Sequence, residues 1–331
     1  MVTKAFLEAE TTELRRRFFE DYKRSIEQGR YAVEDVRRCR SEKWWVEAFV
    51  NRYDGDVDVA LPAMIECMKW RHEFKVNALS AHTLHDSLEK SILYINGFDN
   101  AGVPLLWLCA RHHKKDQFDM ETRRVLVYWL DRHYTQVQAA KKLVVIFDMT
   151  GTGLQHMDLD LIKFLLHCVK YYFPGILAYL LVYDIPWVLN AAWRVVKTWL
   201  DANAQKMVIF VNKESIKQYI SPANLPPHIG GTDDYQFSVV DLLSRDLAAG
   251  TKLSSDGSLI AATALVEDVV DAQSIDSLPY QYQGTLTKPG GPDDPSVDSN
   301  YSSGDAACGD IADAAAVLRK RVGLMATIAA I

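Results

Sequence analysis

The feature that most constrains the fold is a near-continuous apolar run at 143–147 (LVVIF), which ends in an aspartate. A run that does not alternate with polar residues is typical of a strand buried on both faces of a sheet. Two more apolar runs follow at 178–183 and 207–211, and helical patterns at 159–172 and 187–200 separate the three runs. Because strands that alternate with helices form parallel or mixed sheets, the sequence predicts an α/β fold with crossover helices.

The residues before this run show two other patterns. Up to about residue 74, apolar residues recur at helical spacing among charged ones, which predicts short helices that each bury one face, as in a small bundle. Further on, 94–97 and 103–109 flank a turn through Asp99-Asn100-Ala101-Gly102, which predicts a β-hairpin. A long amphipathic helix is expected from about 120 to 138.

The residues after about 237 have a different composition. Aromatic residues nearly vanish, while Ser, Asp, Gly and Pro accumulate, as in GGPDDPSVDSNYSSGD. Such a segment buries too little apolar surface to fold, so it predicts disorder or a linker. We therefore expect three units: a helical region at 1–78, an α/β domain at 79–237 and an acidic low-complexity tail at 238–331.

Composition excludes several classes of protein. The net charge of −6 argues against a general affinity for nucleic acid, which requires a basic surface. No apolar run reaches the length of about 18 residues that a membrane-spanning helix needs, and the first residues lack the apolar core of a signal peptide. The five cysteines are scattered, with no CxxC pair, which predicts reduced thiols in a cytosolic protein.

The search for a catalytic motif ends without a candidate. Asp148-Met149-Thr150-Gly151-Thr152 resembles the phosphorylation motif of P-type ATPases, but methionine replaces its lysine, and the carboxylates that would bind Mg²⁺ are missing. Gly151 and Gly153 resemble the start of a dinucleotide-binding loop, but His156 stands where the third glycine belongs. We expect Asp148 to accept hydrogen bonds from amides of its own turn, and we expect no enzymatic activity.

The histidines do not form a predicted metal site. His82 and His85 share a helix face, and His112 and His113 are adjacent, but no further ligand stands at a useful spacing. We therefore expect surface histidines, no bound metal and no cofactor.

The predicted helix at 187–200 carries the strongest sign of a binding function. Its polar side includes Arg194 and Lys197. A stripe of apolar residues on such a helix packs as core in most proteins, whereas tryptophans flanked by basic residues also suit a helix that meets a membrane interface. Both interpretations stay open at this point. The apolar and aromatic residues of the helix are Leu189, Trp193, Val196 and Leu200, with Trp187 and Trp199 beside them.

An ordered series of short motifs resembles the CRAL-TRIO, or Sec14-like, family. The series extends from Trp44 to about Tyr235, and its order and spacing are more specific than any single motif. In chain order the motifs are DGDVDVAL through KWR (54–71), YINGFD through GVP (94–104), IFDMTG (146–151), YYFP (171–174), DIPW through AAWRVVK (184–197) and LPPHIGG (225–231).

The resemblance implies a mixed or parallel sheet with crossover helices that enclose one apolar pocket for a lipid, after a small helical bundle. The helix at 187–200 corresponds to the mobile gate of the family, so we expect its six apolar and aromatic residues, named above, to contact the lipid. We expect Arg194, Lys197 and Lys206 to contact the headgroup or the membrane. The expected pocket residues on the strands are Trp107, Val145, Phe147, Leu180, Val182 and Ile209.

Two details refine the resemblance. Members that bind phosphatidylinositol have a glutamate after the YP motif and a lysine before the last strand, but Gly175 and Met207 stand there in this chain, with Lys206 adjacent. The lipid is therefore left open between another phospholipid and a sterol-like or isoprenoid ligand. LNAAWRVVKTWL and YISPANLPPHIGGTD resemble the motile sperm domain-containing members, which carry a major-sperm-protein domain and a membrane anchor. Since neither follows here, we expect a shortened isoform, a divergent paralogue or an incomplete gene model.

These expectations describe a cytoplasmic protein without enzymatic activity. We expect it to bind, and to transfer or sense, a phospholipid or other hydrophobic lipid at endomembrane surfaces such as the endoplasmic reticulum, as a peripheral membrane protein with protein partners through its tail. The alternative is a non-transporting module with the same fold that docks on membranes or proteins in an organelle contact or scaffold. A hydrolase or phosphotransferase stands third.

Overall fold

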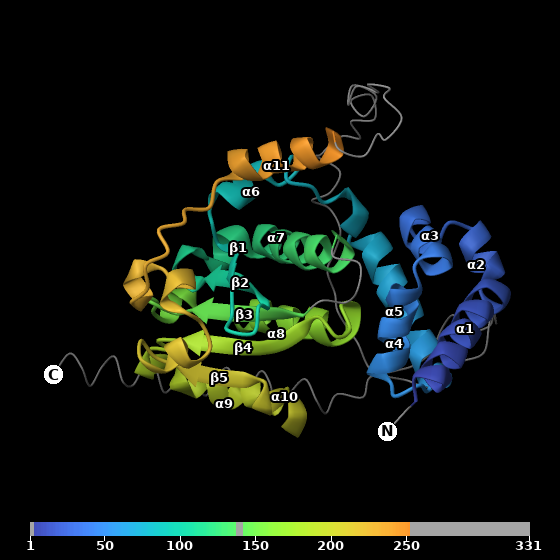
Figure 1. Cartoon of the computed structure of the whole chain (residues 1–331), viewed down its shortest axis with the longest axis horizontal. Coiled ribbons are helices and arrows are strands. Elements are labelled where there is room, and N and C mark those ends of the chain that lie inside the picture. The colour runs from blue at the N-terminus through green and yellow to red at the C-terminus, as the bar shows by residue number, and fades with distance from the viewer. Residues whose placement is uncertain (1–2, 137–141, 252–331) are drawn as a thin grey trace.

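The computed structural model describes residues 3–136 and 142–251, and it is built around one sheet (Figure 1). The sheet has five strands in chain order, of which β1 and β2 are antiparallel and β2 to β5 are parallel. The predicted α/β fold, the mixed sheet and the hairpin are therefore confirmed. The strands are β1 (Leu93–Phe98), β2 (Pro104–Cys109), β3 (Leu143–Asp148), β4 (Leu177–Tyr183) and β5 (Val208–Val211).

A bundle of helices precedes the sheet and lies beside one end of it (Figure 1). A tight turn before the last of these helices depends on glycine, because Gly55 has φ 88° and a Cβ there would lie 2.3 Å from the ring of Phe6. Asp56 then caps the helix through its side chain. The helices are α1 (Lys4–Asp21), α2 (Lys23–Glu27), α3 (Val33–Ser41), α4 (Lys43–Arg52) and α5 (Val57–Glu73).

The bundle and the helix side of the sheet share one hydrophobic core. Trp70 of α5 stacks on Tyr172 with ring centroids 3.8 Å apart, and Trp44 of α4 meets Tyr134 edge to face at 5.2 Å. The chain after the bundle contributes α6 (His85–Glu89), α7 (Lys115–Gln136), α8 (Leu159–His167), α9 (Asn190–Thr198), α10 (Ala202–Lys206) and α11 (Val239–Thr251).

The two faces of the sheet pack against different partners. Leu106, Val145 and Leu180 belong to the core shared with α7, α8 and the bundle. Their strand neighbours point the other way, because successive side chains of a strand alternate between faces. Leu105, Val144 and Leu181 accordingly pack against a closing segment at 215–231.

The closing segment explains the LPPHIGG motif. It consists of short 3₁₀ turns, and its apolar residues Ile216, Ile220, Leu225 and Ile229 are fully buried on the sheet. A Cβ on Gly231 would lie 1.9 Å from the carbonyl oxygen of Leu225, so only glycine fits there.

Three expectations about elements need correction. The helix expected at about 120–138 begins earlier, at Lys115, and the described part ends at Gln136. The helix expected at 187–200 consists of a 3₁₀ turn (Trp187–Leu189) followed by α9. The predicted tail at 238–331 starts with a packed helix, α11, in which Val239 and Leu242 are buried; 252–331 lie outside the described residues. In the described part of the chain, no helix is long and apolar enough to cross a membrane.

Candidate functional site

The gate segment, residues 187–200, lies beside β5 at the opposite edge of the sheet from β1 (Figure 1). It follows a tight turn after β4, where Asp184 adopts a positive φ of 51° and donates its N–H to the carbonyl of Val211 at 3.1 Å. Pro186 then accepts a hydrogen bond from the amide of Leu189 at 2.8 Å, which closes the 3₁₀ turn before α9. The motif DIPW therefore forms a sharp turn that leads into the helix.

The gate segment is amphipathic in the structure. Leu189, Ala192 and Val196 are buried at 1%, 7% and 6% exposure, and α9 packs on α8. Arg194 and Lys197 are exposed on the opposite side of the helix. This pattern shows that the gate segment covers apolar residues with one face and meets solvent with the other.

The tryptophans of the gate segment occupy three different environments. Trp187 is 76% exposed, at the entry to the helix. Trp193 is half-buried and meets Phe210 of β5 edge to face, with ring centroids 4.9 Å apart. Trp199 is half-buried at the end of α9, next to the half-buried Leu200. Phe210 was not predicted, because its contact with Trp193 depends on how α9 packs beside β5 and no sequence pattern specifies that packing.

Four of the six predicted strand residues share one face of the sheet. Val145, Phe147, Leu180 and Val182 all belong to or pack against the core on the helix side. Trp107 and Ile209 lie on the other face with the closing segment, so the prediction that they line the same pocket is wrong. Successive side chains of a strand point to opposite faces, so a shift of one residue in the register between strands moves a side chain to the other face of the sheet.

The interior between the sheet and the gate segment is filled by its own side chains. Val145 and Leu180 are 1% and 7% exposed, and Phe164 and Leu165 of α8 are also buried above the sheet. Two hollows of about 220 and 210 Å³ lie elsewhere, and both are lined by Arg132 of α7 and by residues of α11. Neither is lined by a predicted gate or strand residue.

Exposed cations lie on the gate segment and on the helices next to it in the chain and in space. Arg194, Lys197 and Lys206 are exposed, as is Lys163 of α8. Within the residues that the structure describes, none of the four forms an ion pair. Lys163 was missed by the sequence analysis, although Lys163, His167 and Lys170 recur at i, i+4 and i+7 along α8 and the π-helical turn that follows it.

Asp148, at the carboxyl end of β3, serves the fold. Its carboxylate accepts hydrogen bonds from the amide of Thr150 at 3.0 Å, as predicted, and from Arg111 at 2.8 Å and His228 at 2.9 Å. Burial by itself raises the pKa of this carboxyl, but the hydrogen bonds from His228 and Thr150 outweigh it and hold the pKa at about 2. A carboxylate bound on all these sides ties the closing segment to β3.

The histidines divide into a buried and an exposed group. His113 is 2% exposed and lies between Thr122 and Asp158, with both hydrogen bonds at 3.0 Å, so the expectation of a surface histidine is wrong there. His85 lies at the surface on α6.

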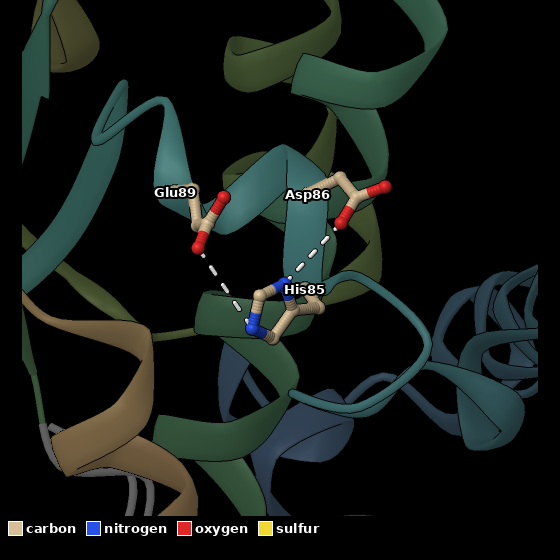
Figure 2. Close-up of side chains that lie close together, drawn as sticks. All are labelled: His85, Asp86 and Glu89. Carbon is tan, nitrogen blue, oxygen red and sulfur yellow. Dashed lines mark hydrogen bonds and ion pairs between the residues drawn. The ribbon is translucent and has the colours of Figure 1, made fainter.

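Figure 2 shows the two carboxylates near His85, which approach different nitrogens of its ring, Asp86 at 3.2 Å and Glu89 at 3.9 Å. Asp86 is 98% exposed. One ligand atom from each of the three residues lies within 4.8 Å of the others, and the cluster stands at the surface.

Comparisons with known proteins agree with this architecture. Residues 88–231 match the CRAL/TRIO domain family. The crystal structure of Sfh5 superimposes with a TM-score of 0.54 over 75% of this chain and 100% of that one, at 14% sequence identity, which shows the fold alone. Residues 88–231 are therefore a CRAL/TRIO domain with the Sec14-like fold.

Two fungal relatives match over a longer stretch than the domain itself. Phosphatidylinositol transfer protein CSR1 of Eremothecium gossypii is 25% identical over 244 residues, which is 68% of this chain and 55% of that protein. A CRAL-TRIO domain-containing protein of Schizosaccharomyces pombe is 25% identical over 238 residues, which is 68% of this chain and 51% of that protein. The chain thus spans about half the length of these relatives.

A third relative is an enzyme, but only a small part of it matches. Human tyrosine-protein phosphatase non-receptor type 9 is 25% identical over 139 residues, which cover 41% of this chain and 23% of the phosphatase. A match of this extent carries no argument for phosphatase activity here. The finer resemblance to the motile sperm domain-containing members stays a prediction.

Proposed function

We propose that this protein binds a phospholipid or another hydrophobic lipid between the helix side of its sheet and the gate segment, and exchanges it at a cytosolic membrane surface. The name of the Eremothecium relative, a phosphatidylinositol transfer protein, supports the lipid class. Because Gly175 and Met207 replace the charged residues of phosphatidylinositol-binding members, we do not assign that headgroup.

The observation that carries the proposal is the two-sided gate segment. Leu189 of its buried face belongs to the same core as the apolar strand residues Val145 and Leu180, and an acyl chain would contact these residues if the segment moved outward. Burial of such a chain is worth about 0.8 kcal/mol per CH₂ group, so an apolar interior binds a lipid without any charged contact. The exposed face offers Trp187, Arg194 and Lys197 to a membrane, and tryptophan beside basic residues is the composition that favours the interface.

The proposed site divides the predicted residues into two groups. Leu189, Val196 and Leu200, with Val145, Phe147, Leu180 and Val182, would contact the acyl chain. Arg194, Lys197 and Lys206 would contact anionic headgroups of the membrane, each contributing about 1 kcal/mol near a charged surface. We also propose that residues 1–78 and 79–237 form one structural unit, which α11 extends.

Native mass spectrometry of the purified protein, followed by extraction and identification of any bound lipid, tests the proposal. The substitution Trp193→Asp should reduce lipid loading from mixed vesicles at least tenfold, because a carboxylate beside Phe210 would hold the gate segment out of its apolar contact. The circular dichroism spectrum should stay that of the wild type. Phe98→Asp, at an aromatic residue that is 53% exposed on β1, is the control and should load normally.

A docking module is the second candidate, and the exposed cations favour it as much as they favour transfer. It predicts that the protein floats with anionic vesicles while its mass shows no bound lipid before or after incubation. That result would support docking as the function of the protein in place of lipid transfer. Lipid loading that survives Trp193→Asp unchanged would show instead that the gate assignment is wrong.

A further inference from the structure

The indole nitrogen of Trp199 has no hydrogen-bond partner. Trp199 directly follows α9, and its Nε1 atom is fully buried without an acceptor. A buried donor without an acceptor costs free energy, since the N–H has lost its water and gained nothing in return. Phenylalanine would bury an aromatic ring there without that cost, so the tryptophan points to an acceptor that reaches this N–H in another state of the protein.

A positive charge lies beside Trp199. The ammonium group of Lys163 lies 6.0 Å from the centroid of the Trp199 ring. The pKa of His167, one turn further along α8, is lowered to about 4, because the ring is buried and because Lys170 and Lys163 repel a proton there. An acceptor that entered this region would therefore be favoured if it carried negative charge.

The acidic residue next to this region, Asp201, is already engaged. Its carboxylate caps α10 by accepting hydrogen bonds from the amides of Asn203 at 3.0 Å and Ala204 at 2.9 Å. Lys163 has no carboxylate within ion-pair distance in the part of the chain that the structure describes. The ammonium and the indole N–H thus form a pair of donors without an acidic partner.

We propose that Trp199 and Lys163 form a subsite for the phosphate group of a bound phospholipid. When the gate segment moves away from the sheet, Nε1 of Trp199 donates a hydrogen bond to a phosphate oxygen, and the ammonium group of Lys163 supplies the countercharge. This inference rests on the proposed lipid-binding function and narrows it to lipids that carry a phosphate, whatever the headgroup beyond it. It also supplies a charged contact in a chain that has Gly175 and Met207 at the usual headgroup positions.

The test compares two lipids that differ in the phosphate, phosphatidic acid and diacylglycerol with the same acyl chains, each offered in phosphatidylcholine-free neutral detergent micelles. Trp199→Phe should lower loading of phosphatidic acid roughly tenfold, which corresponds to about 1.4 kcal/mol, and leave diacylglycerol unchanged. Lys163→Gln should have a similar effect, and the double variant should lose less than the two single losses combined, because both act on one phosphate.

Trp44→Phe is the matched control. Nε1 of Trp44 is also buried without an acceptor, but this residue lies in the N-terminal bundle. Removal of either orphaned N–H should leave the melting temperature unchanged or raise it, whereas only Trp199→Phe should affect loading. In a ¹⁵N spectrum, the indole signal that Trp199→Phe removes should shift when phosphatidic acid is loaded.

The outcomes separate the inference from the proposed function. If the wild-type protein loads neither lipid but native mass spectrometry finds another bound lipid without a phosphate, only the subsite fails; if neither experiment finds a bound lipid, the lipid-binding function fails and the subsite with it. If the wild type loads both and Trp199→Phe loads phosphatidic acid equally well, only the subsite fails. Equal losses for both lipids would overturn it too, by assigning Trp199 a packing role. A shift of the indole signal with inorganic phosphate alone, but not with phosphatidic acid, would mean a site for free phosphate.

Discussion

At the scale of single residues, Asp148 shows how a motif that resembles a catalytic one can serve the fold. The aspartate follows a buried strand and precedes Thr150-Gly151-Thr152, as in a phosphorylated enzyme. In the structure its oxygens accept hydrogen bonds from Thr150, Arg111 and His228. A nucleophilic carboxylate needs a free oxygen and bound magnesium, so this aspartate is placed to hold two segments together.

Asp148→Asn tests this role. The substitution should lower the free energy of unfolding at pH 7 by about 2–3 kcal/mol, because it removes a buried charge that holds Arg111 and His228. Urea denaturation measures the loss. Asp160→Asn, at an exposed carboxylate, should change stability by less than about 1 kcal/mol. Similar effects of the two substitutions would contradict a structural role.

The same carboxylate predicts a dependence on pH. The pKa of Asp148 is about 2 in the folded protein, below the value of about 3.9 in an unfolded chain. A lowered folded pKa stabilises the protein fully above the unfolded value, and this contribution is lost as the pH falls toward 2. The stability difference between wild type and Asp148→Asn should therefore shrink between about pH 4 and pH 2, in melting curves recorded across that range.

At the scale of elements, α9 and α11 are both amphipathic, but they are held differently. The gate segment follows a tight turn and ends where Gln205 donates to the carbonyls of Leu200 at 2.9 Å and Lys197 at 3.2 Å. α11 lies beside α6 (Figure 1). Arg132 of α7 forms an ion pair with Asp246 of α11. Composition alone assigned α11 to the tail, because its few apolar residues gain stability only from contact with the domain.

Two leucines of α11 distinguish a packed helix from a tail. Leu242 is 8% exposed and Leu247 is 67% exposed. Leu242→Ala should lower the free energy of unfolding by about 2–3 kcal/mol, as for other buried leucines, whereas Leu247→Ala should change it by less than about 0.5 kcal/mol. Denaturant titration followed by tryptophan fluorescence measures both. Equal, small effects on the free energy of unfolding would show that α11 does not pack on the domain and belongs to the tail.

At the scale of the whole molecule, a buried polar network joins the bundle to the α/β domain. Asp35 of α3 accepts hydrogen bonds from Arg71 of α5 at 3.0 Å and from Arg38 at 2.6 Å, and Arg71 continues to Asp131 of α7 at 2.8 Å. Burial lowers the pKa of Arg71, but Asp131 and Asp35 outweigh it and raise that pKa above its ordinary value. The network and the shared core make the bundle part of the framework of the α/β domain.

Asp35→Ala should therefore destabilise the whole protein. Loss of this carboxylate leaves buried guanidinium groups without their partner, which costs about 3–5 kcal/mol. Asp58→Ala is the matched control, since Asp58 also pairs with an arginine, Arg17 at 2.7 Å, but is 84% exposed, and its loss should cost less than about 1 kcal/mol. Urea unfolding should stay a single transition. A separate early transition for the bundle would support a boundary at residue 78.

The sequence by itself determined the class of fold and the order of its elements. Period and composition act locally, so the buried run at 143–147, the hairpin and the stripe of the gate segment could be identified without the structure. The motif series that resembles CRAL-TRIO proteins then implied the architecture. The finer limits of elements, such as the 3₁₀ entry into α9, depend on single hydrogen bonds that no pattern specifies.

Only the tertiary structure decided which side chains meet. Trp107 and Val145 are equally apolar in the sequence, but the register of β2 and β3 puts them on opposite faces. Lys163 and Trp199 are 36 positions apart (199 − 163), and the packing of α8 on α9 brings them together. Local periodicity fixes the direction of a side chain relative to its own element, whereas contacts between elements depend on register and packing across the core.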